Sequence, residues 1–178
     1  MKKIQGISSL GRKHRGRLDF RQMKEFEVKV ATAEDIDVLV RQRHMMFEDM
    51  RPRTLDEHKI GDRAYRKWAL QKMRKGLMRC YLVTDGKGKI VGGGGIWLRE
   101  VQPSPGHPSR LVPYLMSMYT DPGFRRRGVA TLVIREAEKW ARDSGYPEMS
   151  LHASRQGRKV YPKLGWKRGW EMYRDLEP

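Results

Sequence analysis

The spacing of apolar residues changes several times along the chain, and each change marks an expected element. Residues 26–30 alternate apolar and charged side chains, as a half-buried strand does. Apolar residues then recur at helical spacing, which predicts a first helix up to about residue 50 and a second over 57–75. Thr32 and Asp35 have nearly the spacing of a capping box and place the start of the first helix. Gly76 is positioned to end the second.

The second half of the chain mixes strand and helix patterns. Residues 80–84 and 90–98 predict two strands joined by the turn sequence Asp85-Gly86-Lys87-Gly88. Residues 111–120 predict another strand, and the apolar stripe of 128–143 predicts an amphipathic helix. A strand over 149–153, a short helix over 157–164 and a last strand over 166–176 complete the pattern.

The predicted order is therefore β-α-α-β-β-β-α-β-α-β. This order indicates an α/β domain (α+β, with a mixed sheet), in which an antiparallel meander leads into one right-handed strand-helix-strand crossover. We expect residues 26–178 to form this single domain. Residues 1–25 carry many basic groups and several glycines without sustained periodicity, so we expect a mobile arm.

Composition adds a strong positive charge and little else. The 178 residues carry a formal net charge of +17, which favours anionic partners such as nucleic acid or phosphorylated ligands. No window approaches the ~18 apolar residues of a membrane-spanning helix. The single cysteine, Cys80, cannot form an internal disulfide, fits a reducing cytosol and lies in no metal-ligand pattern. We therefore expect a cytoplasmic protein without a metal site.

The segment Arg125-Arg126-Arg127-Gly128-Val129-Ala130 lies between a predicted strand and a predicted helix. Cations are disfavoured at a helix N-terminus, because the helix dipole is already positive there. An anion reverses that penalty, since the unpaired N–H groups of the first turn bind anions and a glycine lets a phosphate approach the backbone. The alternative is a solvated basic loop with an ordinary turn glycine.

A second block separates these alternatives. Arg125-x-x-Gly128-x-Ala130, together with Tyr161-x-x-x-Gly165-Trp166, resembles the two signature motifs of the GNAT superfamily of N-acetyltransferases. In that family the first motif holds the pyrophosphate of acetyl-CoA. The second usually has Phe where this chain has Trp166. The order of elements matches over most of the chain.

The resemblance implies a set of site residues. The pyrophosphate would be bound by backbone and side-chain groups of Arg125, Arg126, Arg127, Gly128, Val129 and Ala130. The pantetheine arm would pair with the strand at Met118, Tyr119 and Thr120, and Ser154 would lie beside it or cap a helix. Tyr161 would serve as general acid toward the leaving thiolate, or would only pack against the coenzyme or hydrogen-bond its sulfur. A backbone N–H near Tyr119 would stabilise the oxyanion.

The base and several other features stay open at this stage. Glu100, at the end of a predicted strand, is one candidate for the general base, and ordered water is another. His107 and His152 are weaker candidates. The run Gly92-Gly93-Gly94-Gly95 indicates a bulge, a close approach by a ligand, or a weak strand. Met45, Met46, Phe47 and Met50, on the first predicted helix, are either core or an apolar wall for the acceptor.

The implied function is direct transfer of acetyl from acetyl-CoA to a primary amine in a ternary complex. The sequence does not name the acceptor, although the loops at about 51–61 and 100–110 are where the family builds its acceptor pocket. Homodimers are common in the resembled family. The alternative is a nucleic-acid-associated basic protein that uses the same fold as a scaffold or as an RNA-directed acetyltransferase.

Overall fold

The computed structural model describes residues 25–103, 105, 111–172 and 174. Its helices and strands, in chain order, are β1 (Phe26–Val30), α1 (Ile36–Met50), α2 (Leu55–Arg74), β2 (Met78–Asp85), β3 (Ile90–Glu100), β4 (Leu111–Thr120), α3 (Val129–Asp143) and β5 (Ser150–Leu151). Single turns of 3-10 helix occur at η2 (Ala33–Asp35), η3 (Pro122–Phe124), η4 (Gly157–Lys159) and η5 (Tyr161–Leu164).

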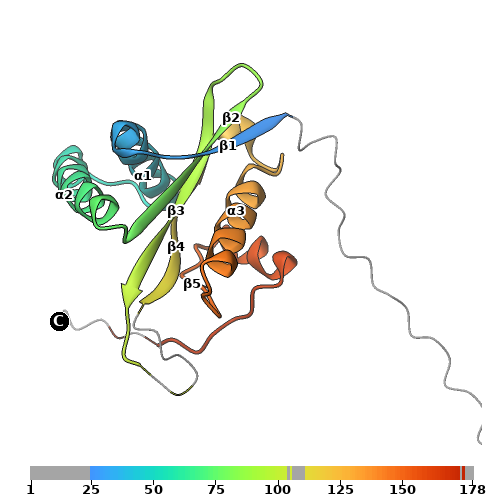
Figure 1. Ribbon diagram of the computed structural model, residues 1–178. Helices are drawn as coiled ribbons and strands as arrows, with labels where there is room; N and C mark the ends of the chain where they lie inside the picture. The colour runs from blue at the N-terminus through green and yellow to red at the C-terminus, as the bar shows by residue number, and fades with distance from the viewer. Residues whose placement is uncertain (1–24, 104, 106–110, 173, 175–178) are drawn as a thin grey trace, which may run out of the picture.

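The five strands form one sheet in the order β1-β2-β3-β4-β5. The first four pair antiparallel, and β5 pairs parallel to β4 after the chain has crossed over through α3. Helices α1 and α2 cover one face of the sheet, and α3 covers the other (Figure 1). The fold class expected from the sequence, a mixed α/β domain with this crossover, is confirmed.

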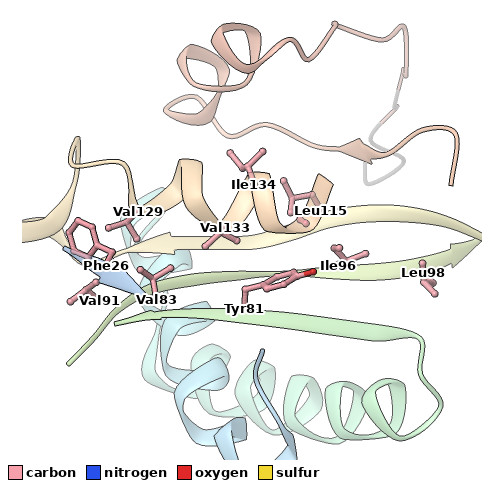
Figure 2. Packing of buried hydrophobic residues seen from close by; sticks show 11 residues of the cluster. Phe26, Tyr81, Val83, Val91, Ile96, Leu98, Leu115, Val129, Val133 and Ile134 are labelled. Carbon is pink, nitrogen blue, oxygen red and sulfur yellow. The ribbon is translucent and has the colours of Figure 1, made fainter. Parts of the chain in front are cut away.

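Each face of the sheet has its own core. Tyr81 and Val83 of β2 point toward α3, whereas Cys80 and Leu82, which alternate with them, point toward α1 and α2. Figure 2 shows Val129 and Val133 of α3 lying over the sheet residues of the first core. Because both faces are covered, the central strands are buried almost continuously.

The helix boundaries follow from local capping. The capping box of Thr32 and Asp35 is present and precedes α1, as predicted. A second capping box, formed by Thr54 and Glu57, starts α2 two residues earlier than the apolar pattern indicated. Gly76 has a φ of 67° directly after the last turn of α2, which is the left-handed conformation that ends a helix.

The glycine run in β3 permits close packing on both faces of the sheet. A Cβ on Gly92 would lie 2.6 Å from Cγ1 of Val129, and one on Gly94 would lie 2.3 Å from Sδ of Met118. A Cβ on Gly93 would lie 2.5 Å from the carbonyl oxygen of Tyr81. The residues that approach are therefore the chain's own, from α3, β4 and β2. All four glycines are buried within β3.

Strand β4 contains a bulge opposite these glycines. The register between β3 and β4 shifts between Gly93, which pairs with Tyr119, and Gly95, which pairs with Met116. Ser117 lies in the bulge with a φ of 54°, and it hydrogen-bonds the side chain of Tyr65. Bulges of this kind redirect the strand and its side chains. Here the bulge turns the end of β4 away from the line of its first half.

The final strand predicted over 166–176 is wrong for the part of that segment that the structure describes. Residues 166–172 and 174 form no strand, and Trp170 and Met172 are 94% and 92% exposed. An alternating pattern forms a strand only where a partner strand supplies hydrogen bonds and a surface to pack on. Residues 166–172 have no partner strand in the described sheet. Likewise, the predicted strand 149–153 is only two residues long, and the predicted helix 157–164 is two separate 3-10 turns.

The predicted arm of residues 1–25 lies outside the described residues, except for Glu25. Within the described chain, no helix is long and apolar enough to span a membrane.

Candidate active site

Strands β4 and β5 separate after only two pairs of residues. Tyr114 pairs with Ser150 and Leu115 with Leu151, and in the described sheet the pairing goes no further. The opening holds a cavity of about 510 Å³. Its walls are the second half of β4, the first turns of α3, the end of α1 and the segment that follows β5. The edge of β4 from Met116 to Thr120 therefore faces the cavity, with backbone groups placed to pair with an extended ligand.

One end of the cavity is the N-terminus of α3. Gly128 is the N-cap residue with a φ of 93°, and the described chain provides no side-chain cap for this helix. The N–H groups of the first turn have no intrahelical acceptor, so they remain available to an anion. Arg126 also has a left-handed φ, 64°. Adjacent residues of opposite backbone hand form a concave nest of N–H groups that suits an anion.

The three arginines before α3 have different positions. Arg125 and Arg126 line the cavity, whereas Arg127 is not among the described lining residues. Arg127 pairs with Glu25, and its guanidinium lies over the rings of Phe26 and Phe124 at 5.3 and 4.9 Å. Its charge is thus turned to the outside of the loop.

Arg125 joins the loop to two other elements. Its Nε donates to the carbonyl oxygen of Thr120 at 3.1 Å, and its guanidinium forms an ion pair with Asp49 of α1. The pair connects the loop before α3 to α1. Met46, Phe47 and Met50 of α1 also line the cavity.

Tyr161 lies on the opposite wall and is mostly buried. Burial raises the pKa of its phenol to about 12, and the neighbouring Tyr114 acts in the same direction. Its ring packs 5.8 Å from the ring of Trp166. Gly157 leaves room for the Tyr161 ring, since a Cβ on Gly157 would lie 2.8 Å from Cε2. The two aromatic residues of the second motif therefore fix each other.

Ser154 both lines the cavity and caps a turn. Its Oγ accepts a hydrogen bond from the N–H of Gly157 at 3.1 Å. The capping role considered from the sequence is therefore present, and the hydroxyl hydrogen stays free to rotate toward the cavity.

A second polar group on the cavity wall contains His152, which the sequence analysis treated as a weaker candidate. Nδ1 of His152 lies 2.6 Å from the hydroxyl of Tyr114, and Nε2 lies 3.0 Å from a carboxylate oxygen of Glu171. Tyr114 and His152 both line the cavity. Burial raises the pKa of Tyr114, so its hydroxyl stays protonated. Glu171 comes from the segment predicted as a strand, and no sequence pattern linked it to His152.

Glu100 lies elsewhere. It ends β3, pairs in register with Leu111 and is exposed, and it is not one of the described residues that line the cavity. His107 lies outside the described residues. All the other predicted site residues except Arg127 line the same cavity, although they come from two separate parts of the sequence, 118–130 and 154–161.

This fold and site define an acyl-CoA acyltransferase class, and comparison with known proteins gives the family. The sequence model of the acetyltransferase (GNAT) family matches residues 43–166. The chain belongs to the GNAT acetyltransferase family, and the resemblance inferred from its motifs is confirmed. The expected use of acetyl-CoA is confirmed at the level of this family. Comparison with curated proteins finds no significant match.

Solved structures agree on the fold. A GCN5-related N-acetyltransferase from Ralstonia eutropha JMP134 is 26% identical, with a TM-score of 0.77 over 85% of this chain and 98% of that one. A predicted acetyltransferase with acetyl-CoA from Clostridium acetobutylicum is 22% identical, with a TM-score of 0.73 over 85% of this chain and 96% of that one. A ribosomal-protein-alanine N-acetyltransferase from Brucella melitensis biovar Abortus 2308 is 17% identical, with a TM-score of 0.65 over 85% of this chain and 98% of that one.

Proposed function

We propose that this protein transfers the acetyl group of acetyl-CoA directly to a primary amine while both substrates are bound. The observation that carries the proposal is the unpaired edge of β4. This edge runs along the cavity from the anion-binding turn of α3 toward the wall that bears Tyr161 and His152. A long ligand with a pyrophosphate at one end and a reactive thioester at the other fits that arrangement.

The residues present suit the coenzyme. The first turn of α3 and Arg126 would hold the pyrophosphate through backbone N–H groups and charge. Met118, Tyr119 and Thr120 would pair with the amide groups of pantetheine as an added strand. Ser154 would meet the arm from the other side. Arg127, which pairs with Glu25, would contribute only to the overall positive field.

Tyr161 would donate a hydrogen bond to the sulfur atom as the thiolate leaves. A phenol with a pKa of about 12 is fully protonated at neutral pH. This pKa lies well above the ~8.5 of a typical thiol, so outright proton transfer to the thiolate is unfavourable. The hydrogen bond alone stabilises the charge that develops on sulfur. Burial of Tyr161 therefore favours a donor role over that of a free acid.

Tyr114, His152 and Glu171 would remove the proton from the amine. As the amine nitrogen bonds to the carbonyl carbon and the carbon–sulfur bond breaks, the nitrogen loses a proton to the Tyr114 hydroxyl. That hydroxyl passes its own proton to Nδ1 of His152 across 2.6 Å. Glu171 stabilises the resulting imidazolium. The proton then leaves to solvent, to which the half-exposed His152 has access. Glu100 is not assigned this role because of its position.

The acceptor would enter beside α1. Apolar side chains of Met46, Phe47 and Met50 form this wall, and Asp49 supplies a carboxylate. The fold neighbours do not choose the acceptor, since one is an aminoglycoside acetyltransferase, AAC(6')-Iy, solved with a bisubstrate analogue, and another acts on ribosomal-protein alanine. A panel of peptides, aminoglycosides and small amines, monitored by release of free thiol, would identify the class.

The coenzyme site is tested by a matched pair of substitutions at Gly128. Asn and Asp both tolerate a positive φ and have nearly the same shape, but Asp adds a negative charge to the anion site. Acetyl-CoA should raise the melting temperature of the wild type, and of Gly128→Asn to a lesser degree. Gly128→Asp should show no shift. If the two variants respond equally, or the wild type does not respond, the proposal fails.

A further inference from the structure

Helices α1 and α2 pack against each other through four polar side chains. His44 and Glu48 lie one turn apart on α1, and His58 and Asp62 lie one turn apart on α2. The contacts cross between the helices: Nδ1 of His44 lies 2.8 Å from Oδ2 of Asp62, and Nε2 of His58 meets Oε1 of Glu48. The two imidazole rings stack with centroids 3.8 Å apart.

His58 is unusual among these residues because it is buried, with 7% of its side chain exposed. Glu48, His44 and Asp62 retain 37%, 33% and 26% exposure. A buried imidazole beside partly exposed carboxylates gives a site that is fixed at its base and open to solvent at its mouth. This arrangement suits an ion that enters from water.

We propose that His44, Glu48 and His58 bind a divalent transition-metal ion, with Zn²⁺ as the best fit. One ligand atom from each residue lies within 4.8 Å of the other two. Tetrahedral Zn²⁺ with bonds of ~2.0–2.2 Å requires ligand atoms about 3.3 Å apart. The two partly exposed side chains, His44 and Glu48, would turn to close the site. Two imidazoles and one carboxylate form a donor set that Zn²⁺ uses, with water in the fourth position.

Asp62 completes the arrangement from outside. It engages Nδ1 of His44, which leaves Nε2 of that ring for the ion. A carboxylate behind a ligating imidazole fixes the tautomer and raises the basicity of the ligand nitrogen. The two ring planes are 22° apart. Because an imidazole binds a metal ion in its own ring plane, the partly exposed His44 ring would turn relative to His58 for both rings to reach one ion.

The ion would hold α1 against α2. In the same stretch of α1, Met46, Phe47 and Asp49 line the catalytic cavity. His44 and Glu48 alternate with these residues and lie toward α2. The ion would thus fix the position of the acceptor wall without touching the reacting atoms. It would act through the position of α1, and acetyl transfer needs no step through it.

Metal binding is tested on the full chain after treatment with a chelator. The wild type should bind one Zn²⁺ per chain by equilibrium dialysis, and Zn²⁺ should raise its melting temperature. Co²⁺ in the same site should give the visible absorption of a four- or five-coordinate ion. Mg²⁺ and Ca²⁺ should give no shift, because they prefer oxygen ligands. A wild type that binds no Zn²⁺ stoichiometrically overturns the proposal.

Variants locate the ion. His44→Ala and Glu48→Gln should weaken Zn²⁺ binding by at least 10-fold, and Asp62→Asn, which leaves the ligands in place, by about 10–100-fold. The matched control, Asp56→Asn, lies exposed on the same helix and should bind as the wild type does. If His58→Ala does not fold, the other three variants still decide. Unchanged affinity in His44→Ala and Glu48→Gln would place the ion elsewhere and refute this site.

Discussion

The hydroxyl of Tyr114 lies 2.6 Å from Nδ1 of His152, which connects β4 to the segment that follows β5. Leu115 and Leu151 are the last residues of the two strands that pair, so this hydrogen bond lies at the end of the paired stretch, directly before the strands separate. Tyr114 and His152 both line the cavity in which the acceptor amine would meet the thioester. Their hydrogen bond gives the proposed proton path a defined start and end.

Removing the Tyr114 hydroxyl should slow acetyl transfer. Tyr114→Phe keeps the ring and deletes the relay oxygen, so kcat should fall about 100-fold, at the lower end of the range of general acid–base catalysis. His152→Gln should have a similar effect. The double variant should be no worse than either single one, because both interrupt one path. Steady-state kinetics measure this, and multiplicative losses would contradict a shared path.

Tyr161→Phe should lower kcat and leave the binding of acetyl-CoA nearly unchanged. The hydroxyl stabilises charge that exists only as sulfur leaves, and removing one such donor costs about 10²-fold. The ring still packs on Trp166. Comparison of kcat with the dissociation constant of acetyl-CoA separates the two roles. An equal loss in binding would show that the residue serves only as a packing wall.

Ionisation of Tyr161 should also not contribute to the alkaline limb of the pH profile of kcat. Because burial raises its pKa to about 12, the phenol remains protonated throughout the usable pH range. Tyr161→Phe should therefore lower the plateau of log kcat without moving either limb. Profiles between about pH 6 and 10 measure this. An alkaline limb that vanishes in the variant would show that the phenol titrates there.

Cys80 should resist thiol reagents until the protein unfolds. It is 1% exposed, and burial raises its pKa to about 12, so the reactive thiolate is scarce. This shift stabilises the fold below the ordinary thiol pKa, and the contribution is lost as pH rises toward 12. When the folded protein is mixed with an aromatic disulfide at pH 8, absorbance of the released aromatic thiol should show no fast labelling of Cys80. Fast labelling without denaturant would contradict the buried position.

The glycine run gives a stability prediction. Gly93→Ala places a Cβ 2.5 Å from the carbonyl oxygen of Tyr81, which a sheet cannot easily move, so we expect a loss of about 1–3 kcal/mol. Gly61→Ala is the control: it lies in α2 with nothing within 4 Å of the new Cβ. It should stabilise by about 0.5–1 kcal/mol. Denaturant unfolding compares them, and equal effects would refute the packing account.

The sequence predicted most elements because local signals set them. Strands 26–30 and 111–120 have the predicted bounds, and the Thr32 capping box forms as expected. The second capping box, Thr54 with Glu57, was readable from its spacing and was overlooked. The segment 166–176 shows the limit of such signals. Its alternation is a local property, whereas strand formation depends on a partner that the fold does not offer there.

The candidate site also has a part that local sequence predicts and a part that it does not. The anion end was predictable, because residues 125–130 are contiguous and a helix start has a fixed chemistry. The proton path was not, since Tyr114, His152 and Glu171 are far apart in the sequence and only the folded chain brings them together. The pairing of His44 and Glu48 with His58 and Asp62 likewise needs two helices to pack. Glu100 was favoured for its position on a strand, and it lies away from the cavity.

The four glycines of β3 also limit which substitutions the protein can accept. Every coding change at glycine adds a side chain, and around this run the space is already taken by β2, β4 and α3. Selection would therefore purge variants here as strictly as at a catalytic residue, although these positions perform no chemistry. Invariance in this strand would record the history of a tight helix–sheet contact, and a search for substrate contacts guided by invariance alone would be drawn to the wrong place.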